Sequence, residues 1–280
     1  MTERDQQYME LALQQAHLAH LEGEVPIGAV VVHPQRGVVG VGRNRREFGR
    51  SALAHAEIEA IDMACRTLKG WRLMDCDLYV TLEPCPMCAG AILNARIRKV
   101  YYGAKDHRFG AAGSTTDLFS VEYNHRAQVE GGVLEEECSA LISQFFRELR
   151  WRRENGIQVR RMCRKEGSLA GRMLEELGCA EGRKSLFAPG TQYFMVAIRE
   201  GQVIGLATIT PDGKLAHLGV LPQWRGHGLA GALHRALEGK ARRTGIPRLW
   251  CEQRDWQPFL EKMGYRQEGQ SWVLPLTQEV

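Results

Sequence analysis

Apolar residues recur along the first half of the chain with two different periods, and these periods predict its elements. From Asp5 to Glu22 the spacing is helical, whereas Ile27–Val32 and Val38–Gly42 are short runs rich in valine, joined by a turn, which predicts a hairpin. Further helices are expected over Ala54–Leu68, Cys88–Ala95 and Glu135–Arg153, and further strands over Leu78–Leu82 and Lys99–Tyr102. Such alternation is typical of an α/β sheet with helices on its faces.

A second unit is predicted from about Ile157 onward, because Gly156 suits the end of the preceding helix. The expected strands are Tyr193–Ile198, Val203–Ile209, Leu215–Leu221 and Leu249–Cys251, and the expected helices are Leu169–Leu177, Gly228–Arg243 and Trp256–Met263. A chain of 280 residues is long enough for two domains. We therefore predict α/β domains at residues 1–153 and 157–280.

The composition indicates a protein that stays in the cytoplasm. The apolar fraction of 44% is ordinary for a globular protein, and no apolar run approaches the roughly 18 residues of a membrane span. The first residues are charged and are not followed by the apolar stretch of a secretion signal. Two of the eight cysteines belong to the motif described below, and the others show no disulfide framework spacing, as expected for reduced thiols.

The net charge of +4 is distributed unevenly. Residues 1–153 carry 19 Lys and Arg against 20 Asp and Glu, whereas residues 154–280 carry 18 against 13. A dense basic stretch lies where the two parts meet, and it comprises Arg147, Arg150, Arg152, Arg153, Arg160, Arg161, Arg164 and Lys165. Such a stretch could contact nucleic-acid phosphates, or it could be a solvated helix end, where cations are favourable in any case. Charge alone leaves both interpretations open.

Two short motifs carry the chemistry: His55-Ala56-Glu57, and Pro84-Cys85-Pro86-Met87-Cys88. One imidazole and two thiolates suit a zinc ion, and three protein ligands leave the fourth tetrahedral position for a water whose pKa the metal lowers. Glu57 can move a proton from that water to a leaving amine. The prolines favour a helix start, and a helix N-terminus favours the thiolate form of the cysteines. We predict metal ligation by His55, Cys85 and Cys88, and catalysis by Glu57.

The cysteine pair alone would allow other interpretations. It could be a redox pair or half of a structural zinc site. A structural site would need a fourth ligand at similar spacing, and no second Cys-x-x-Cys or His-x-His pair is visible in the sequence. A redox pair would leave His55 and Glu57 without a role. The combination of motifs is the signature of zinc-dependent base deaminases.

Residues 1–153 closely resemble the bacterial tRNA adenosine deaminase family. The matching segments include residues 25–31, 42–44, 54–58, 79–92, 102–106, 110–114 and 145–147. These segments are more specific than the zinc signature, which deaminases of free bases and nucleosides share. One departure is Ala52-Leu53-Ala54, where the family often has Asp-Pro-Thr before its His-Ala-Glu.

The resemblance implies a cytidine-deaminase-like three-layer α/β/α fold and a homodimer with one zinc ion in each deaminase domain. It also implies conversion of the wobble adenosine of an arginine tRNA to inosine. Asn44 matches a residue that contacts the flipped base, and Asp106 lies in a loop that follows the anticodon backbone in the family. An anticodon loop suits this chemistry, since its bases leave the stack at low cost. Deamination of a free base or nucleoside, or RNA or acetyl-CoA binding with an idle zinc site, are the alternatives.

The second domain resembles the GNAT N-acyltransferase superfamily over roughly residues 157–276. Residues 217–230 look like its acyl-CoA loop, with Arg225, Gly226, Gly228 and Ala230 as the expected cofactor-binding residues, and residues 259–265 resemble its closing motif. Small residues before a helix let backbone N–H groups approach a pyrophosphate. Many family members carry a tyrosine as general acid where this chain has Leu260.

The activity of the second domain is open at this stage. His217 could act as a base or be an ordinary strand residue. The domain could acetylate an amine, bind acetyl-CoA without turnover, or help to hold tRNA.

Overall fold

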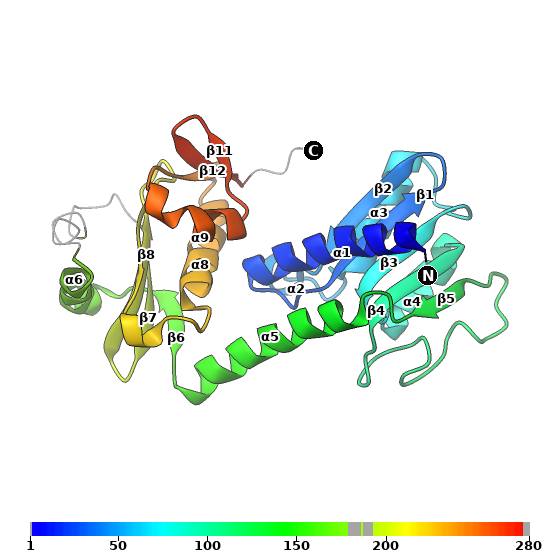
Figure 1. Cartoon of the computed structure of the whole chain (residues 1–280), viewed down its shortest axis with the longest axis horizontal. Helices are drawn as coiled ribbons and strands as arrows, with labels where there is room; N and C mark the ends of the chain where they lie inside the picture. Colours follow the sequence, from blue (N-terminus) through cyan, green and yellow to red (C-terminus); the bar gives the residue numbers. More distant parts are fainter. Residues whose placement is uncertain (1, 179–185, 187–192, 277–280) are drawn as a thin grey trace. The chain divides into compact units, whose positions relative to one another are not determined.

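The computed structural model describes residues 2–178, 186 and 193–276, and it divides into two compact units, Met1–Phe146 and Arg147–Val280 (Figure 1). Among the described residues, the first unit contains one sheet and the second unit contains two. No helix among the described residues is long and apolar enough to span a membrane.

The first unit is built on a five-stranded sheet in the order β2-β1-β3-β4-β5. Strand β1 pairs antiparallel with both β2 and β3, whereas β3, β4 and β5 are parallel. The strands are β1 (Gly28–His33), β2 (Gly37–Arg43), β3 (Asp77–Leu82), β4 (Lys99–Ala104) and β5 (Gln128–Gly131). The predicted hairpin is confirmed, with Val30 opposite Val41.

Helices cover both faces of this sheet, which confirms the three-layer α/β/α prediction. On one face, Ala60 and Ile92 share a core cluster with Val31. On the other, Met9 and Cys138 pack with Val30. The helices are α1 (Glu3–Glu22), α2 (Arg46–Gly49), α3 (Ala56–Leu68), α4 (Pro86–Ala95) and α5 (Glu135–Glu154).

Glycines let two helices lie unusually close to the sheet. A Cβ at Gly28 would stand 2.1 Å from the carbonyl oxygen of Ala12 in α1, and one at Gly42 would stand 2.1 Å from that of Ala56 in α3. No side chain fits there, because real Cβ atoms do not approach backbone oxygen so closely. The contact at Gly42 brings the first turn of α3 against β2, which positions the His-x-Glu motif.

The parallel pairing of β3 and β4 brings two loops to one edge of the sheet. Leu82 and Ala104, at the carboxyl ends of the two strands, are opposite each other in the register. The chain that follows β3 carries Cys85 and Cys88, and the chain that follows β4 carries Asp106. The N–H of Ala111 donates to the carbonyl oxygen of Pro84 at 2.8 Å and joins the loops.

The second unit contains an antiparallel sheet in the order β6-β7-β8-β9 and a smaller antiparallel sheet in the order β10-β12-β11. Helices α8 and α6 cover opposite faces of the larger sheet, since Gly205 faces Leu233 of α8, whereas Gly219 faces Met173 of α6. The strands are β6 (Gln158–Arg161), β7 (Tyr193–Arg199), β8 (Gln202–Ile209), β9 (Leu215–Val220), β10 (Arg248–Cys251), β11 (Arg266–Glu268) and β12 (Ser271–Pro275). The helices are α6 (Gly167–Glu176), α8 (Leu229–Arg243) and α9 (Gln257–Lys262).

Candidate metal centre and its surroundings

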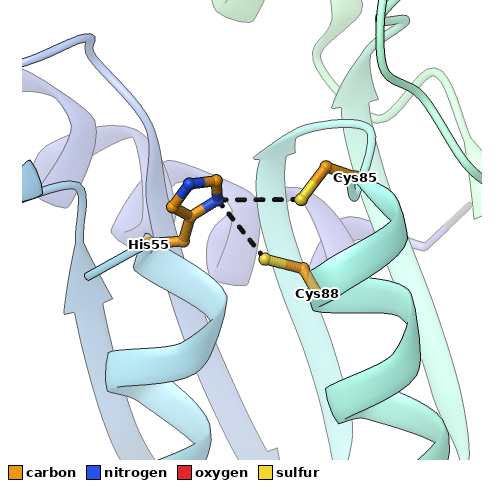
Figure 2. A group of neighbouring side chains, drawn as sticks. All are labelled: His55, Cys85 and Cys88. Atoms are coloured by element: carbon orange, nitrogen blue, oxygen red, sulfur yellow. Dashed lines mark hydrogen bonds between the residues drawn. The ribbon is translucent and has the colours of Figure 1, made fainter. Parts of the chain in front are cut away.

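Three predicted ligands, far apart in the sequence, lie together in the first unit. His55 is the N-cap residue of α3, Cys85 is the N-cap residue of α4, and Cys88 lies in the first turn of α4. Figure 2 shows their side chains pointing toward one another from the two helix starts. His55 Nδ1 lies 3.8 Å from Cys85 Sγ and 3.5 Å from Cys88 Sγ. Among the described residues, this is the one group of His, Cys, Asp and Glu side chains close enough to hold a metal.

The three ligand atoms fit a tetrahedral zinc ion. All of them lie within 4.8 Å of one another. Zinc–nitrogen and zinc–sulfur bonds of usual length place such atoms about 3.6–3.8 Å apart across one ion. One imidazole and two sulfurs are a donor set that zinc prefers, and three protein ligands leave one position for water or substrate. The residues present therefore suit this ion.

The local environment shifts the pKa values of the two cysteine thiols in opposite directions. A hydrogen bond from Cys88 and the neighbouring His55 lower the pKa of Cys85 to about 4. The pKa of Cys88 lies far above its ordinary value, because its thiol donates to Cys85 and is buried. The hydrogen bond with Cys85 raises the pKa of His55. In the protein alone one thiolate is thus already favoured, as a metal site needs.

Glu57 is a buried carboxyl beside this cluster. It lies in the first turn of α3 and is 4% exposed. Burial raises the pKa of Glu57 to about 7, and its carboxyl group contacts Cys88. A carboxyl group with a pKa near neutrality can both accept and return a proton. The position of Glu57, two residues after His55, explains why one helix start supplies both a ligand and a proton-transfer group.

Asn44 lies at the end of β2, close to the start of the His-x-Glu motif. It is 3% exposed, and its side-chain amide donates to the carbonyl oxygen of Val25 at 3.4 Å. The next residue, Arg45, donates its backbone N–H to the carbonyl oxygen of Ala54. These hydrogen bonds hold Asn44 in place and tie the chain after it to the segment that leads into His55.

Asp106 lies in the loop after β4 and turns its carboxylate back into that loop. One oxygen, Oδ1, accepts the backbone N–H groups of Arg108 at 2.9 Å and Phe109 at 3.2 Å. This is the pattern of an Asx turn. The structure thus brings Asp106 to the edge that carries the cysteines and assigns its carboxylate a local role in shaping the loop.

Glu83 is a residue that sequence reasoning did not select. It is 2% exposed, and its carboxylate accepts backbone N–H groups of Asp106, Ala112 and Ser114 at 3.1, 2.9 and 3.0 Å. These hydrogen bonds lower its pKa against the opposing effect of burial. The sequence did contain one signal for this role. Glu83 stands between an apolar strand and the cysteine motif, where a carboxylate is expected to be buried and therefore hydrogen-bonded.

In the second unit, the predicted acyl-CoA loop lies between β9 and α8. Gly226 and Gly228 have positive φ values of 84° and 75°, which suit glycine. Gly228 is the N-cap residue of α8 and has no side chain to cover the helix start. Arg225 is exposed, and its Nε donates to the carbonyl oxygen of Val220. Ala230 lies in the first turn of α8. The backbone conformation thus suits close approach of a ligand.

His217, the possible base, and Leu260, which replaces a tyrosine of the family, differ in their surroundings. His217 Nδ1 lies 2.9 Å from the hydroxyl of Thr208, and burial lowers the pKa of His217. Leu260 is fully buried. The position at which many family members carry a tyrosine is therefore a core position in this chain.

Comparisons with known proteins agree with the division into two units. Residues 3–150 match the MafB19-like deaminase family, and residues 157–265 match the acetyltransferase (GNAT) family. The second match confirms the predicted GNAT-like fold.

Three relatives illustrate what the first half resembles. A tRNA-specific adenosine deaminase of Bacillus subtilis (strain 168) is 49% identical over 148 residues, which are 52% of this chain and 91% of that protein. A tRNA-specific adenosine deaminase of Haemophilus influenzae is 43% identical over 150 residues, which are 53% and 87% of the two chains. A solved structure from work on A-to-I editing by tRNA:A34 deaminases is 47% identical, with a TM-score of 0.47, and covers 48% of this chain and 98% of that one.

The deaminase match spans more than half of the chain, and the Bacillus protein is matched over nearly its whole length. On this ground, the chain belongs to the MafB19-like deaminase family, with relatives among the tRNA-specific adenosine deaminases, and carries a GNAT-like domain after its deaminase domain.

Proposed function

We propose that this protein deaminates the wobble adenosine of a tRNA, an arginine tRNA by the family resemblance, to inosine with the help of one zinc ion in each deaminase domain. The single observation that carries the proposal is the convergence of His55, Cys85 and Cys88 beside the buried Glu57. The identity to tRNA-specific adenosine deaminases supports adenosine in tRNA as the substrate.

Zinc would be held by His55, Cys85 and Cys88, and it supplies Lewis-acid activation of a water molecule when bound. Glu57 would take up a proton from the water as its oxygen bonds to C6 of the base, and would pass that proton to N1. It would then carry the remaining hydroxyl proton to the amino group, so that the C6–N bond breaks, ammonia leaves and a carbonyl remains at C6. Buried in the first turn of α3, it is held at a fixed position relative to His55. We assign Asn44 and Asp106 to the substrate side, the former beside the flipped base and the latter in the loop along the anticodon backbone.

We place the domains at residues 1–153 and 157–280 and expect the protein to act as a cytoplasmic homodimer. A second proposal concerns the GNAT-like domain. The two glycines with positive φ at the start of α8 support binding of acetyl-CoA through Arg225, Gly226, Gly228 and Ala230.

The test is incubation of the purified full chain with an arginine tRNA transcript, followed by sequencing for inosine at the wobble position. Inosine is expected with the wild type and not with Glu57→Ala. Absence of inosine with the wild type, together with release of ammonia from guanine, cytosine or cytidine, would replace the proposal with deamination of a free base or nucleoside. Full zinc content without turnover of any of these substrates would indicate a binding protein.

A further inference from the structure

The loop Lys105–Phe109, here called the β4 loop, carries an unusual exposed aromatic side chain. Phe109 is 68% exposed, the largest fraction among the exposed large hydrophobic residues of the described chain. Lys105, His107 and Arg108 of the same loop are also exposed. Contact of so much of a phenyl ring with water is unfavourable. Proteins that bind single-stranded nucleic acid do so with surfaces that combine cationic and aromatic side chains.

The β4 loop is held firmly although it lies at the surface. From inside, Asp106 Oδ1 accepts the N–H groups of Arg108 and Phe109. From beneath, the buried Glu83 accepts the N–H of Asp106. Gly110 closes the loop against Glu83, since a Cβ there would stand 2.4 Å from the Glu83 carboxylate. Phe109 is therefore presented on a fixed backbone, which lowers the entropy lost when the ring binds a partner.

The β4 loop also lies beside the metal-binding turn. Glu83 is two residues before Cys85, and the carbonyl oxygen of Pro84 accepts the N–H of Ala111 just beyond the loop. A substrate that reaches the metal centre with one base out of the stack has neighbouring bases with exposed faces. An aromatic ring in this loop is placed to stack on one of them.

We infer that Phe109 stacks on a base flanking the reacting adenosine, and that Glu83 is the positioning residue that holds the β4 loop for this contact. The inference rests on the proposed function. Phe109 contributes to binding of RNA and does not take part in the chemical step. Glu83 acts on the substrate only through the loop.

The test uses the anticodon stem-loop of an arginine tRNA and the purified full chain. Phe109→Ala is expected to raise KM roughly tenfold, with kcat within about twofold, since stacking of one base is lost. Phe109→Trp should restore KM. Trp71→Ala is the matched control, because Trp71 is 53% exposed but follows the opposite end of α3, and it should leave KM unchanged.

The role of Glu83 is tested by Glu83→Gln, which keeps the shape of the side chain but replaces one accepting oxygen by a donor. It should raise KM as Phe109→Ala does, keep the zinc content, and add little to the effect of Phe109→Ala in the double variant. An unchanged KM in Phe109→Ala overturns the inference while leaving the proposed function intact. The role of Glu83 would be overturned if Glu83→Gln lost its zinc, or if the increases in KM caused by Glu83→Gln and Phe109→Ala multiplied in the double variant. No inosine with the wild type would overturn both proposals.

A separate observation concerns the start of α8 in the second unit. The carboxylate of Glu148, in the part of α5 that belongs to this unit, lies against Gly228, so that a Cβ there would stand 2.6 Å from Glu148 Oε2. One turn further along α5, the ring of Trp151 stacks on that of His227, with centroids 3.8 Å apart and an angle of 10° between the planes. Trp151 also contacts Trp224. Glu148 and Trp151 thus lie over the loop Trp224–Gly228.

The charges around Glu148 are those of an anion site. A helix N-terminus carries a partial positive charge that favours a carboxylate or a phosphate. Two guanidinium groups, those of Arg152 and Arg235, lie nearby: burial lowers the pKa of both, and the negative charge of Glu148 opposes that effect. Arg235 extends back toward the start of α8, since its Nη1 would lie 3.0 Å from a Cβ at Gly231.

We propose that Glu148 occupies, from within the chain, the position at which this loop would take the pyrophosphate of an acyl-CoA. A second anion there would meet the carboxylate at close range, and like charges at close range repel. Acyl-CoA binding by this domain then requires displacement of Glu148 and Trp151 from the loop.

Calorimetric titration of the full chain with acetyl-CoA tests this proposal. Glu148→Gln should lower Kd roughly tenfold or more relative to the wild type. Glu154→Gln is the matched control, because it removes the same charge from an exposed position near the end of α5. Acetylpantetheine, which lacks the pyrophosphate, should bind both variants equally. Equal Kd values for acetyl-CoA in the two variants would overturn the proposal, and so would absence of binding in the wild type, Glu148→Gln and Glu148→Ala alike.

Discussion

His55 Nδ1 lies 3.5 Å from Cys88 Sγ, although 33 residues separate the two in the sequence. The two side chains meet because α3 and α4 begin at the same edge of the sheet and pack on the same face. A metal ion bound at this point joins the starts of two helices. Its removal should therefore affect stability as well as activity.

Removal of zinc should abolish deamination and lower the melting temperature. Dialysis against a zinc chelator is expected to remove inosine formation, and addition of zinc should restore it. Cys88→Ala should bind no zinc by elemental analysis. Cys163→Ser is the control, because Cys163 is an exposed thiol of the second unit, and it should retain one zinc ion in the deaminase domain. A chelated protein with unchanged melting temperature and activity would contradict this expectation.

Replacement of Glu57 should remove the chemical step without removing the metal. Glu57→Gln retains the size of the side chain but cannot accept a proton, so kcat should fall by about 10²–10⁴-fold. Zinc content should stay at the wild-type value, because Glu57 is not needed as a ligand. Single-turnover measurement on the anticodon stem-loop separates this loss from slow product release. A variant that keeps more than a tenth of the wild-type kcat would show that another group transfers the proton.

The sequence predicted the elements around the metal centre well, because local signals coincide there. Each of the two helix starts was marked by the motif itself, and the helix expected over Ala54–Leu68 begins only two residues later than predicted, at Ala56. Apolar runs marked the strands between them. The meeting of His55, Cys85 and Cys88 followed from the chemistry of the residues and is what the structure shows.

Among the elements that the sequence did not predict, β5 and β6 have no local signal, whereas β12 was missed although Trp272, Val273 and Leu274 form an apolar run. Strands β5 and β6 are four residues long and half exposed, so that they lack an apolar run. Their place depends on partners distant in sequence, as Val129 pairs with Val100. Likewise, the partners of Glu83 lie 23 to 31 residues away, and Glu148 meets Gly228 across 80 positions. Such contacts are determined by tertiary packing.

The close approach of α1 to β1 gives a stability prediction. Gly28→Ala should lower the free energy of unfolding by more than about 2 kcal/mol, since the added methyl group would overlap the backbone at Ala12 and neither element can move easily. Gly90→Ala is the control. Gly90 lies within α4, and a Cβ there meets no atom within 4 Å, so this change should stabilise by roughly 0.5–1 kcal/mol. Urea titration followed by circular dichroism measures both. Equal midpoints for the two variants would contradict the packing argument.

The buried His234 should make the stability of the second unit depend on pH. Burial lowers the pKa of His234 to about 3, against an ordinary value of 6.5, while its Nε2 lies 2.9 Å from the hydroxyl of Tyr265. Between these two values the unfolded chain binds a proton that the folded chain does not, so stability is fully present above pH 6.5 and falls as the pH is lowered. A change from pH 7 to 5.5 should cost about 1 kcal/mol from this residue.

Five of the six tryptophans, Trp151, Trp224, Trp250, Trp256 and Trp272, lie in the second unit and report its unfolding in urea. His234→Gln can still reach Tyr265 but does not titrate, and it should flatten this pH dependence. A variant with the same slope as the wild type would show that other groups determine the acid sensitivity of the second unit.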